Sequence, residues 1–201
     1  MKETLRLALV LTLIAAGAGL ILSLVESATR APIAEQRRQE TLRALRAVLP
    51  PVDNAPDTDT VELKIGQDRR GRDLSRTFYR GRIGGELAGV AFPVTAPDGY
   101  SGNIDIMVGV RPDGVVQAIA ILQHAETPGL GDKIGADWFR GQFPGKHREN
   151  ADWRVKKDGG DFDQITGATI SARAVVTAVR QGLDFFQANA DVILGREEGA
   201  E

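Results

Sequence analysis

The chain of 201 residues contains no cysteine and only two histidines. Without cysteine it cannot form thiolate zinc sites, cysteine-held iron–sulfur clusters or disulfides. Two histidines also argue against a metal site with several imidazole ligands. Neither charge sign dominates, because 25 Lys and Arg face 27 Asp and Glu for a formal net charge of −2, which argues against nucleic acid as a partner. Redox chemistry in this chain would therefore require an organic cofactor.

The length suffices for one domain of ordinary size together with an anchor and connecting segments. Five parts are expected: a tail over residues 1–6, a transmembrane helix over 7–25, an amphipathic helix with a linker over 26–60, a folded domain over 61–195, and a tail over 196–201. The periodicities of the domain predict an α+β fold with a mainly antiparallel sheet and flanking helices.

Residues 7–25 form an apolar run without a charge. As a helix this run would span about 28 Å at about 1.5 Å per residue, close to the hydrocarbon thickness of a bilayer. A cleavable signal peptide is the alternative, but its apolar region is usually only about 7–15 residues long and ends in small residues at a cleavage site. Residues 26–30 do not resemble such a site, so the sequence favours a retained anchor.

The charges around this run leave its orientation open. Lys2 and Arg6 precede the run, whereas five arginines follow it between residues 30 and 46. A plain count of basic residues would place the domain in the cytoplasm. That rule weakens for a large translocated domain, however, and the nearest charge after the run is the acidic Glu26.

Pro32 is expected to begin a separate amphipathic helix over residues 33–49, because this stretch contains strong helix formers and no internal Pro or Gly. The apolar side chains near its end recur at helical spacing and predict a docking stripe. Two prolines end the helix, and residues 52–60, which are rich in Asp, Pro and Asn, predict a linker.

Beyond residue 60 the apolar residues alternate with the period of strands. A Gly-Gly pair at 84–85 lies between two such segments and predicts a hairpin. An Asp-Gly pair at 113–114 lies between the alternating segments 103–110 and 115–122, which predicts a second hairpin with a two-residue turn. A glycine-rich loop over 126–131 then leads into a short helix.

Residues 163–169 read Asp-Gln-Ile-Thr-Gly-Ala-Thr and precede a strongly periodic helix. Ser171 is expected to cap that helix, so that Thr169 would lie just before the first turn. Free backbone N–H groups and the helix dipole favour a phosphate at such a place. Gly167 and Ala168 add little bulk, so another molecule can approach the Thr169 hydroxyl. By itself the pattern also fits an ordinary capped turn that enters a helix.

The pattern D-x-x-[ST]-G-A-T resembles the flavinylation motif at which a periplasmic flavin transferase moves FMN from FAD to the final threonine. All fixed positions of the motif are filled, by Asp163, Thr166, Gly167, Ala168 and Thr169. The resemblance implies a phosphoester between the Thr169 oxygen and the FMN phosphate, so that the flavin would be covalently bound.

Two further loops resemble the G subunit of the Rnf ion-translocating electron transport complex. They are Glu-Thr-Pro-Gly-Leu-Gly-Asp at 126–132 and Gly-Tyr-Ser-Gly at 99–102. The resemblance covers nearly the whole chain, including the apolar run near the amino end. The C subunit of the sodium-pumping NADH:quinone reductase is a related protein but usually a longer chain, so the length favours the Rnf protein.

This resemblance implies a membrane-anchored electron-transfer subunit whose FMN-binding domain, residues 61–195, faces the periplasm from the bacterial inner membrane. Its partners would be the other membrane subunits of a respiratory complex that couples electron transfer between ferredoxin and NAD to ion translocation, with a flavin transferase during maturation. The chain would transfer electrons without being a self-sufficient enzyme. A non-redox membrane-anchored scaffold or solute-binding module is the alternative, and the visible spectrum of the purified protein separates the two.

The resemblance also implies which residues lie near the cofactor. The candidates are Thr169, Asp163, Thr166, Gly167, Ala168, Glu126, Thr127, Gly129, Leu130, Tyr100 and Ser101. Asp163 and Thr166 would mainly serve recognition by the transferase, although a turn carboxylate is the alternative for Asp163. Glu126 would offer an acceptor near the flavin, or it would belong to a structural turn. For Tyr100 and Ser101 the alternative is a tight connection between strands.

Overall fold

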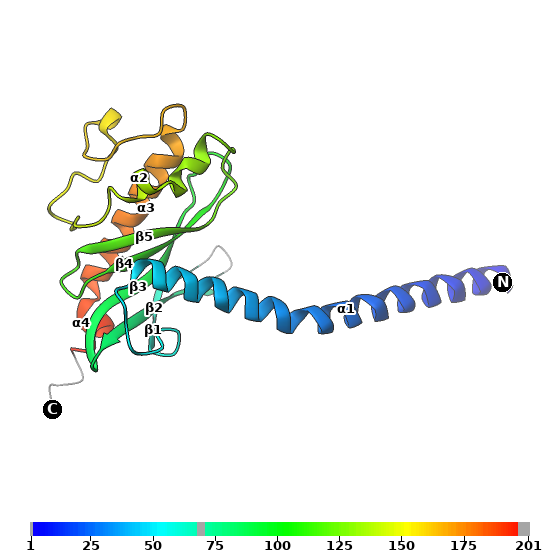
Figure 1. The fold of residues 1–201 in the computed structure, drawn as a ribbon. Coiled ribbons are helices and arrows are strands. Elements are labelled where there is room, and N and C mark those ends of the chain that lie inside the picture. The colour runs from blue at the N-terminus through cyan, green and yellow to red at the C-terminus, as the bar shows by residue number, and fades with distance from the viewer. Residues whose placement is uncertain (1, 68–70, 197–201) are drawn as a thin grey trace. The chain divides into compact units, whose positions relative to one another are not determined.

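The structure, a computed structural model, describes residues 2–67 and 71–196 (Figure 1). The chain divides into two compact units, Met1–Thr41 and Leu42–Glu201. The first unit is helical throughout its described residues, and the second contains the sheet.

Helix α1 (Lys2–Val48) is continuous, with Pro32 inside it. The prediction that a separate helix begins at Pro32 is therefore wrong. A proline in a helix interior removes one backbone donor and costs about 3 kcal/mol. The residues on both sides of Pro32 are exposed and mostly good helix formers. The carbonyl four residues before Pro32 loses its backbone donor but can bond to water instead, and the helix continues.

The amino-terminal part of α1 is long and apolar enough to cross a membrane. Its most apolar window of 18 residues has a mean hydropathy of 2.5, and none of the window is buried. A core helix of similar composition would be covered by other elements, whereas Leu11 and Leu22 are 70% and 69% exposed. An uncovered apolar helix of this length fits a membrane anchor.

The described residues of the second unit form a five-stranded antiparallel sheet in the order β1-β2-β3-β4-β5. The strands are β1 (Thr60–Gln67), β2 (Asp73–Ile83), β3 (Glu86–Ala96), β4 (Ile104–Val110) and β5 (Val116–Gln123). The helices that follow are η1 (Gly131–Gly135), α2 (Asp137–Arg140), η2 (Lys156–Asp158), α3 (Thr169–Ala188) and α4 (Ala190–Leu194). This architecture confirms the predicted α+β class.

Both predicted hairpins are present, but one turn differs. Gly84 and Gly85 have φ angles of 58° and 85° and form the predicted two-residue turn between β2 and β3. The turn between β4 and β5 is longer than two residues, because the Arg111 N–H donates to the Val115 carbonyl at 2.9 Å. A proline follows Arg111, and proline favours the second position of a type I turn, which lengthens the loop.

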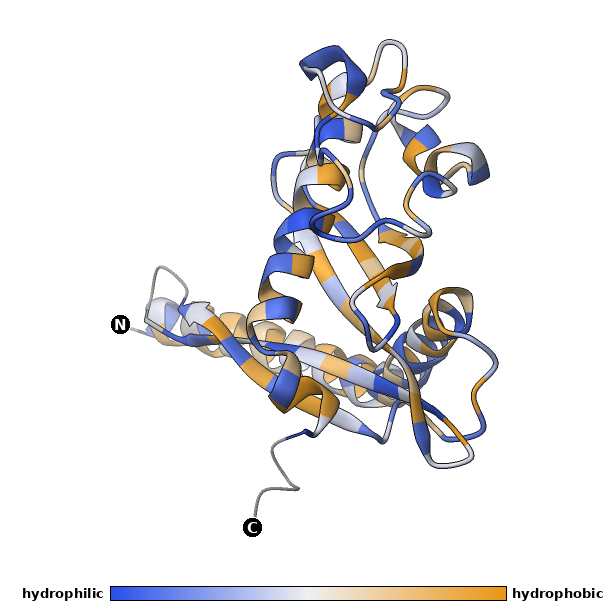
Figure 2. Ribbon diagram, turned by 90° about the vertical axis from the view of Figure 1, so that its left-hand side faces the viewer, coloured by the Kyte–Doolittle hydropathy of each residue, from blue (hydrophilic) through white to orange (hydrophobic). Residues whose placement is uncertain are grey.

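One face of the sheet carries the main core. Helix α3 packs there with ten buried residues, and aromatic rings join it to the strands. The centroids of Phe78 and Phe92 lie 5.1 Å apart, and Phe92 stacks on Phe186 at 6.0 Å. In Figure 2 hydrophobic and hydrophilic residues alternate along the strands and helices. This alternation is expected where one face of a strand or helix is buried and the other is exposed.

The other face of the sheet receives the last turns of α1. Val48 and Leu49 are buried there against small strand residues. At Gly109 the approach is so close that an added Cβ would overlap the Val48 carbonyl oxygen and lie 2.7 Å from its carbon. At Gly89 an added Cβ would lie 3.2 Å from Leu49. Glycine is therefore needed at Gly109 for the backbones to approach.

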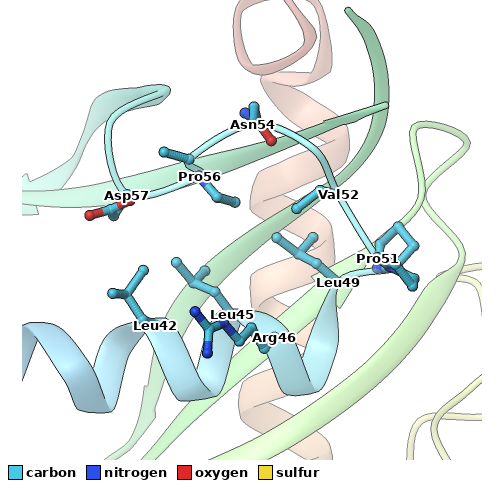
Figure 3. A pocket seen from close by; sticks show the side chains of 11 residues that line it. Leu42, Leu45, Arg46, Leu49, Pro51, Val52, Asn54, Pro56 and Asp57 are labelled. Carbon is cyan, nitrogen blue, oxygen red and sulfur yellow. The ribbon is translucent and has the colours of Figure 1, made fainter. Parts of the chain in front are cut away.

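Beside this contact, residues 42–57 enclose a pocket of about 510 Å³ (Figure 3). Leucines of α1 form one wall, and the segment after the helix forms the other. Asn54 fixes that segment, because its side-chain amide donates to the Arg80 carbonyl and accepts from the Arg82 N–H, both at 2.9 Å. Asp53 accepts from the Gly84 N–H at 2.6 Å.

Candidate functional site

Helix α3 begins at Thr169 and has Ala168 as its N-cap residue, without a side-chain cap. The prediction that Ser171 caps this helix is therefore wrong. Ser171 lies within the first turn, is fully buried, and donates its hydroxyl to the Glu126 carboxylate. A buried carboxylate requires hydrogen-bond donors. The Ser171 hydroxyl serves as one of them and is therefore not available to cap the helix. Thr169 consequently belongs to the first turn, where backbone N–H groups have no intrahelical partners.

Gly167 gives the chain before α3 its shape. Its φ of 84° lies in the left-handed region, which side chains other than glycine rarely adopt. An added Cβ would also lie 2.9 Å from Leu130 Cδ1. Gly167 therefore permits both the turn into α3 and the close approach of Leu130.

A pocket of about 540 Å³ opens beside Thr169. Its lining residues are Tyr100, Glu126, Thr127, Leu130, Gly131, Lys157, Gly167, Ala168, Thr169, Ile170 and Ser171. Seven of the eleven predicted cofactor residues are among them. Four segments of the chain thus meet here: the loop before β4, the loop after β5, η2, and the start of α3. The volume lies within the range of about 300–1,000 Å³ that is usual for ligand pockets.

Glu126 is buried, with 4% of its surface exposed. One carboxylate oxygen accepts the Ser101 N–H at 3.0 Å, and the other accepts the Ser171 hydroxyl. Gly99 and Gly131 leave room for these oxygens, since an added Cβ would lie 2.9 Å and 2.7 Å from them, respectively. The carboxylate therefore links the loop before β4, the loop after β5 and the start of α3.

The loop after β5 is shaped by its own hydrogen bonds. The Thr127 carbonyl accepts the N–H groups of Leu130 at 3.2 Å and Asp132 at 3.3 Å. Asp132 in turn accepts the Gly129 N–H at 2.9 Å, and Gly129 has a φ of 74°. The turn places Thr127 and Leu130 in the pocket wall, while Gly129 provides only the turn.

Lys157 brings a positive charge to the pocket, and sequence reasoning missed it. The backbone N–H of Lys157 donates to Gln164 Oε1 at 3.2 Å. The neighbouring Asp158 is held by Arg173 of α3 through two hydrogen bonds of 2.7 and 3.0 Å. These bonds hold the pKa of the Asp158 carboxyl below its usual range. Lys157 is one of two adjacent exposed lysines, so no local pattern could have identified it.

Four predicted residues do not line the pocket: Asp163, Thr166, Gly129 and Ser101. Asp163 forms an ion pair with Lys156 at 2.8 Å, and both side chains are more than half exposed. Its backbone N–H donates to Gln142 Oε1 at 2.5 Å. Thr166 is exposed as well. Ser101 contributes its backbone to Glu126 rather than its side chain to the pocket.

This arrangement suits an anionic group beside a planar ring. The first turn of α3 favours an anion beside Thr169. Lys157 adds a cation, and Tyr100 and Leu130 add apolar surface against which a ring can pack. The pocket therefore combines groups for a negative charge with groups for a ring system.

Comparison with known proteins agrees with this geometry. A family model for the FMN-binding domain matches residues 99–184, and one for the RnfG N-terminal region matches residues 1–48. The chain is 43% identical to the G subunit of the ion-translocating oxidoreductase complex of Pseudomonas aeruginosa, over 99% of this chain and 96% of that protein. It is 42% identical to the G subunit of the same complex of Aliivibrio fischeri, over 91% and 90% of the two chains.

Two solved structures share the fold. NqrC of Shewanella oneidensis matches with a TM-score of 0.50 and 20% identity over 75% of this chain and 73% of that one. The C subunit of the Na(+)-translocating NADH-quinone reductase from Parabacteroides distasonis matches with a TM-score of 0.57 and 17% identity over 79% and 95% of the chains. At these identities the likeness concerns the fold.

Proposed function

The chain belongs to the family of G subunits of ion-translocating oxidoreductase complexes, and we propose on this basis that it carries FMN as a phosphoester on Thr169 and transfers electrons within such a complex. The observation that carries the proposal is the position of Thr169. This residue lies in the first turn of α3, in the wall of a pocket that also contains Lys157.

Attachment of FMN requires a flavin transferase and FAD as the donor. The Thr169 oxygen would attack the phosphorus next to the riboflavin part of FAD, the bond to AMP would break, and the hydroxyl proton would leave. The first turn of α3 and Lys157 would then neutralise the phosphate. The bound flavin supplies the electron-transfer chemistry, whereas the protein holds it in place and sets its surroundings.

Asp163 and Thr166 would serve the transferase rather than the bound cofactor. Both are exposed and lie outside the pocket lining, so another protein can contact them before attachment. The ion pair between Asp163 and Lys156 is exposed, and such pairs contribute little to stability. Asp163→Ala should therefore lower flavin occupancy and leave the melting temperature unchanged.

The partners of the chain would be the other membrane subunits of a complex that couples ferredoxin and NAD electron transfer to ion movement. Helix α1 would anchor the chain in the bacterial inner membrane, with the flavin domain in the periplasm, where the transferase acts. Protease added to spheroplasts should then remove the domain and leave a membrane-bound stub. Protection of the domain would reverse this topology.

A gel assay tests the attachment. The chain is co-expressed with a flavin transferase, denatured, and examined for a fluorescent band. Thr169→Ala should abolish the band because the ester oxygen is lost. Thr177→Ala should keep it, since this threonine lies two turns further along α3, away from the pocket of Thr169. A band that survives Thr169→Ala, or no band from the native chain, would contradict the proposal.

A further inference from the structure

The surroundings of Glu126 are unusual for a buried carboxylate. Burial of a charge is costly unless another charge or hydrogen bonds compensate for it. Within residues 2–67 and 71–196, Glu126 forms no ion pair, and its carboxylate is compensated by the Ser101 N–H and the Ser171 hydroxyl. Gly99 and Gly131 leave the space that its oxygens occupy. The pocket wall is thus built around this side chain.

The first segment that depends on Glu126 is the loop over residues 98–102. The Ser101 N–H donates to Glu126, and this bond ties the loop to the segment after β5. The loop carries Tyr100, which lines the pocket and is 69% exposed. Loss of Glu126 would therefore remove a bond that holds the residue next to Tyr100 in the pocket wall.

The second segment is the first turn of α3. Ser171 lies two residues after Thr169, and its hydroxyl bonds the second carboxylate oxygen. A helix turn is rigid once its hydrogen bonds form, so a bond at Ser171 also fixes the direction of the Thr169 Cα–Cβ bond. One carboxylate therefore determines the positions of both Tyr100 and Thr169.

We propose that Glu126 is a positioning residue, which holds the Tyr100 loop and the first turn of α3 at a fixed separation so that Tyr100 packs on the ring of the flavin attached to Thr169. This rests on the proposed attachment of FMN. Both carboxylate oxygens of Glu126 bond protein donors, so the role assigned to Glu126 does not require a contact with the cofactor. Its role is exerted through Ser101 and Ser171.

Substitutions of Glu126 distinguish the effect of its hydrogen bonds from the effect of its negative charge. In Glu126→Gln the amide oxygen can accept the Ser101 N–H, and the amide nitrogen can donate to Ser171, whose hydroxyl then acts as an acceptor. Glu126→Ala removes both bonds and leaves the Ser101 N–H without a partner. Glu126→Asp keeps the charge but is one methylene too short, and it replaces Glu126→Ala if that variant does not fold. Glu149→Ala, at an exposed carboxylate, is the control.

The first measurement is amide hydrogen exchange in protein made without a transferase, and it does not depend on flavin. In Glu126→Ala the Ser101 amide should exchange about tenfold faster, because it loses its one hydrogen bond to the carboxylate. Amides of β3 and β4 should be unchanged. Glu126→Gln and Glu149→Ala should resemble the native protein. Faster exchange throughout the sheet would show a general structural role and overturn the inference.

The second measurement is flavin fluorescence in protein loaded with FMN. A tyrosine packed on a flavin ring quenches its fluorescence, so Glu126→Ala should be brighter per bound flavin than the native protein, and Glu126→Gln should not. If Glu126→Gln is as bright as Glu126→Ala, the charge matters and the positioning role is wrong. If the native chain takes up no flavin, the proposed function fails, while hydrogen exchange still tests the role of Glu126.

Discussion

The two faces of the sheet receive their helices in different ways. On one face α3 packs through large side chains such as Phe92 and Phe186, which bury much apolar area and supply stability. On the other face the end of α1 meets glycine and alanine, and at Gly109 backbone lies against backbone. At the first contact an added methyl group on Gly182 of α3 would meet side chains, which can shift, whereas at Gly109 it would meet the backbone of Val48, which cannot rotate away.

Each region also has a pocket of similar size, about 510 Å³ beside α1 and about 540 Å³ beside α3. The first is lined mainly by leucine, proline and other apolar residues. It also contains Arg46 and Asp57, and its Asn54 bonds the backbone of β2. The second combines a hydroxyl, an ammonium group and a helix amino terminus. Volume alone therefore does not identify a functional site, and the convergence of polar groups does.

The largest effect on stability is expected from Gly109→Ala. The added methyl group would overlap the Val48 carbonyl, and neither partner is a side chain that can rotate away. Overpacking of this kind costs about 3 kcal/mol at the upper end of its usual range. Chemical unfolding should show this loss, while flavin occupancy per folded molecule should stay at the native level.

Gly135→Ala is the matched control for Gly109→Ala, because an added Cβ there meets nothing within 4 Å and Gly135 has no positive φ. Its free energy of unfolding should change little. If both variants were equally stable, the close contact between Gly109 and Val48 would not hold the end of α1 on the sheet.

A smaller effect on stability, but a larger one on flavin, is expected from Gly167→Ala. The positive φ of Gly167 costs a side chain about 1–2 kcal/mol, and its Cβ would press on Leu130 in the pocket wall. Gly145→Ala is the control, since Gly145 has a φ of 79° and nothing within 4 Å of an added Cβ. Both variants should lose similar stability in thermal unfolding, but only Gly167→Ala should show a weaker fluorescent band. Equal bands would contradict the role assigned to Gly167.

The sequence predicted those parts of the molecule that depend on neighbouring residues. The apolar run over 7–25, the Gly84-Gly85 hairpin and the helix after residue 169 each follow from local spacing, and all are present. The resemblance to the Rnf G subunit is confirmed, because 43% identity extends over 99% of the chain. Attachment of FMN to Thr169 stays a prediction.

The sequence could not predict features that depend on distant partners. Ser171 has the residue type of a helix cap, but its partner Glu126 lies 45 positions away. Lys157 lines the pocket, and the adjacent Asp158 pairs with Arg173, which lies 15 positions after Asp158.

The sequence also led to a wrong prediction for a local reason. Pro32 is expected to end one helix and begin another, yet the cost of the proline is outweighed by the helix formers around it and α1 continues.

The smallest effect is expected from Lys157→Gln, which tests whether the ammonium group beside Thr169 contributes to the function proposed for the α3 pocket. Lys157 is exposed, so the free energy of unfolding should be unchanged. Loss of its charge near the phosphate should slow flavin attachment about fivefold, since exposed charge contacts contribute up to about 1 kcal/mol. The difference should shrink at high salt, because exposed charges are screened.

Lys133→Gln is the control, at an exposed lysine of η1 outside the pocket lining. This variant should attach flavin at the native rate. If the two variants attach flavin at the same rate, Lys157 has no special place beside Thr169, and the helix amino terminus alone must neutralise the phosphate.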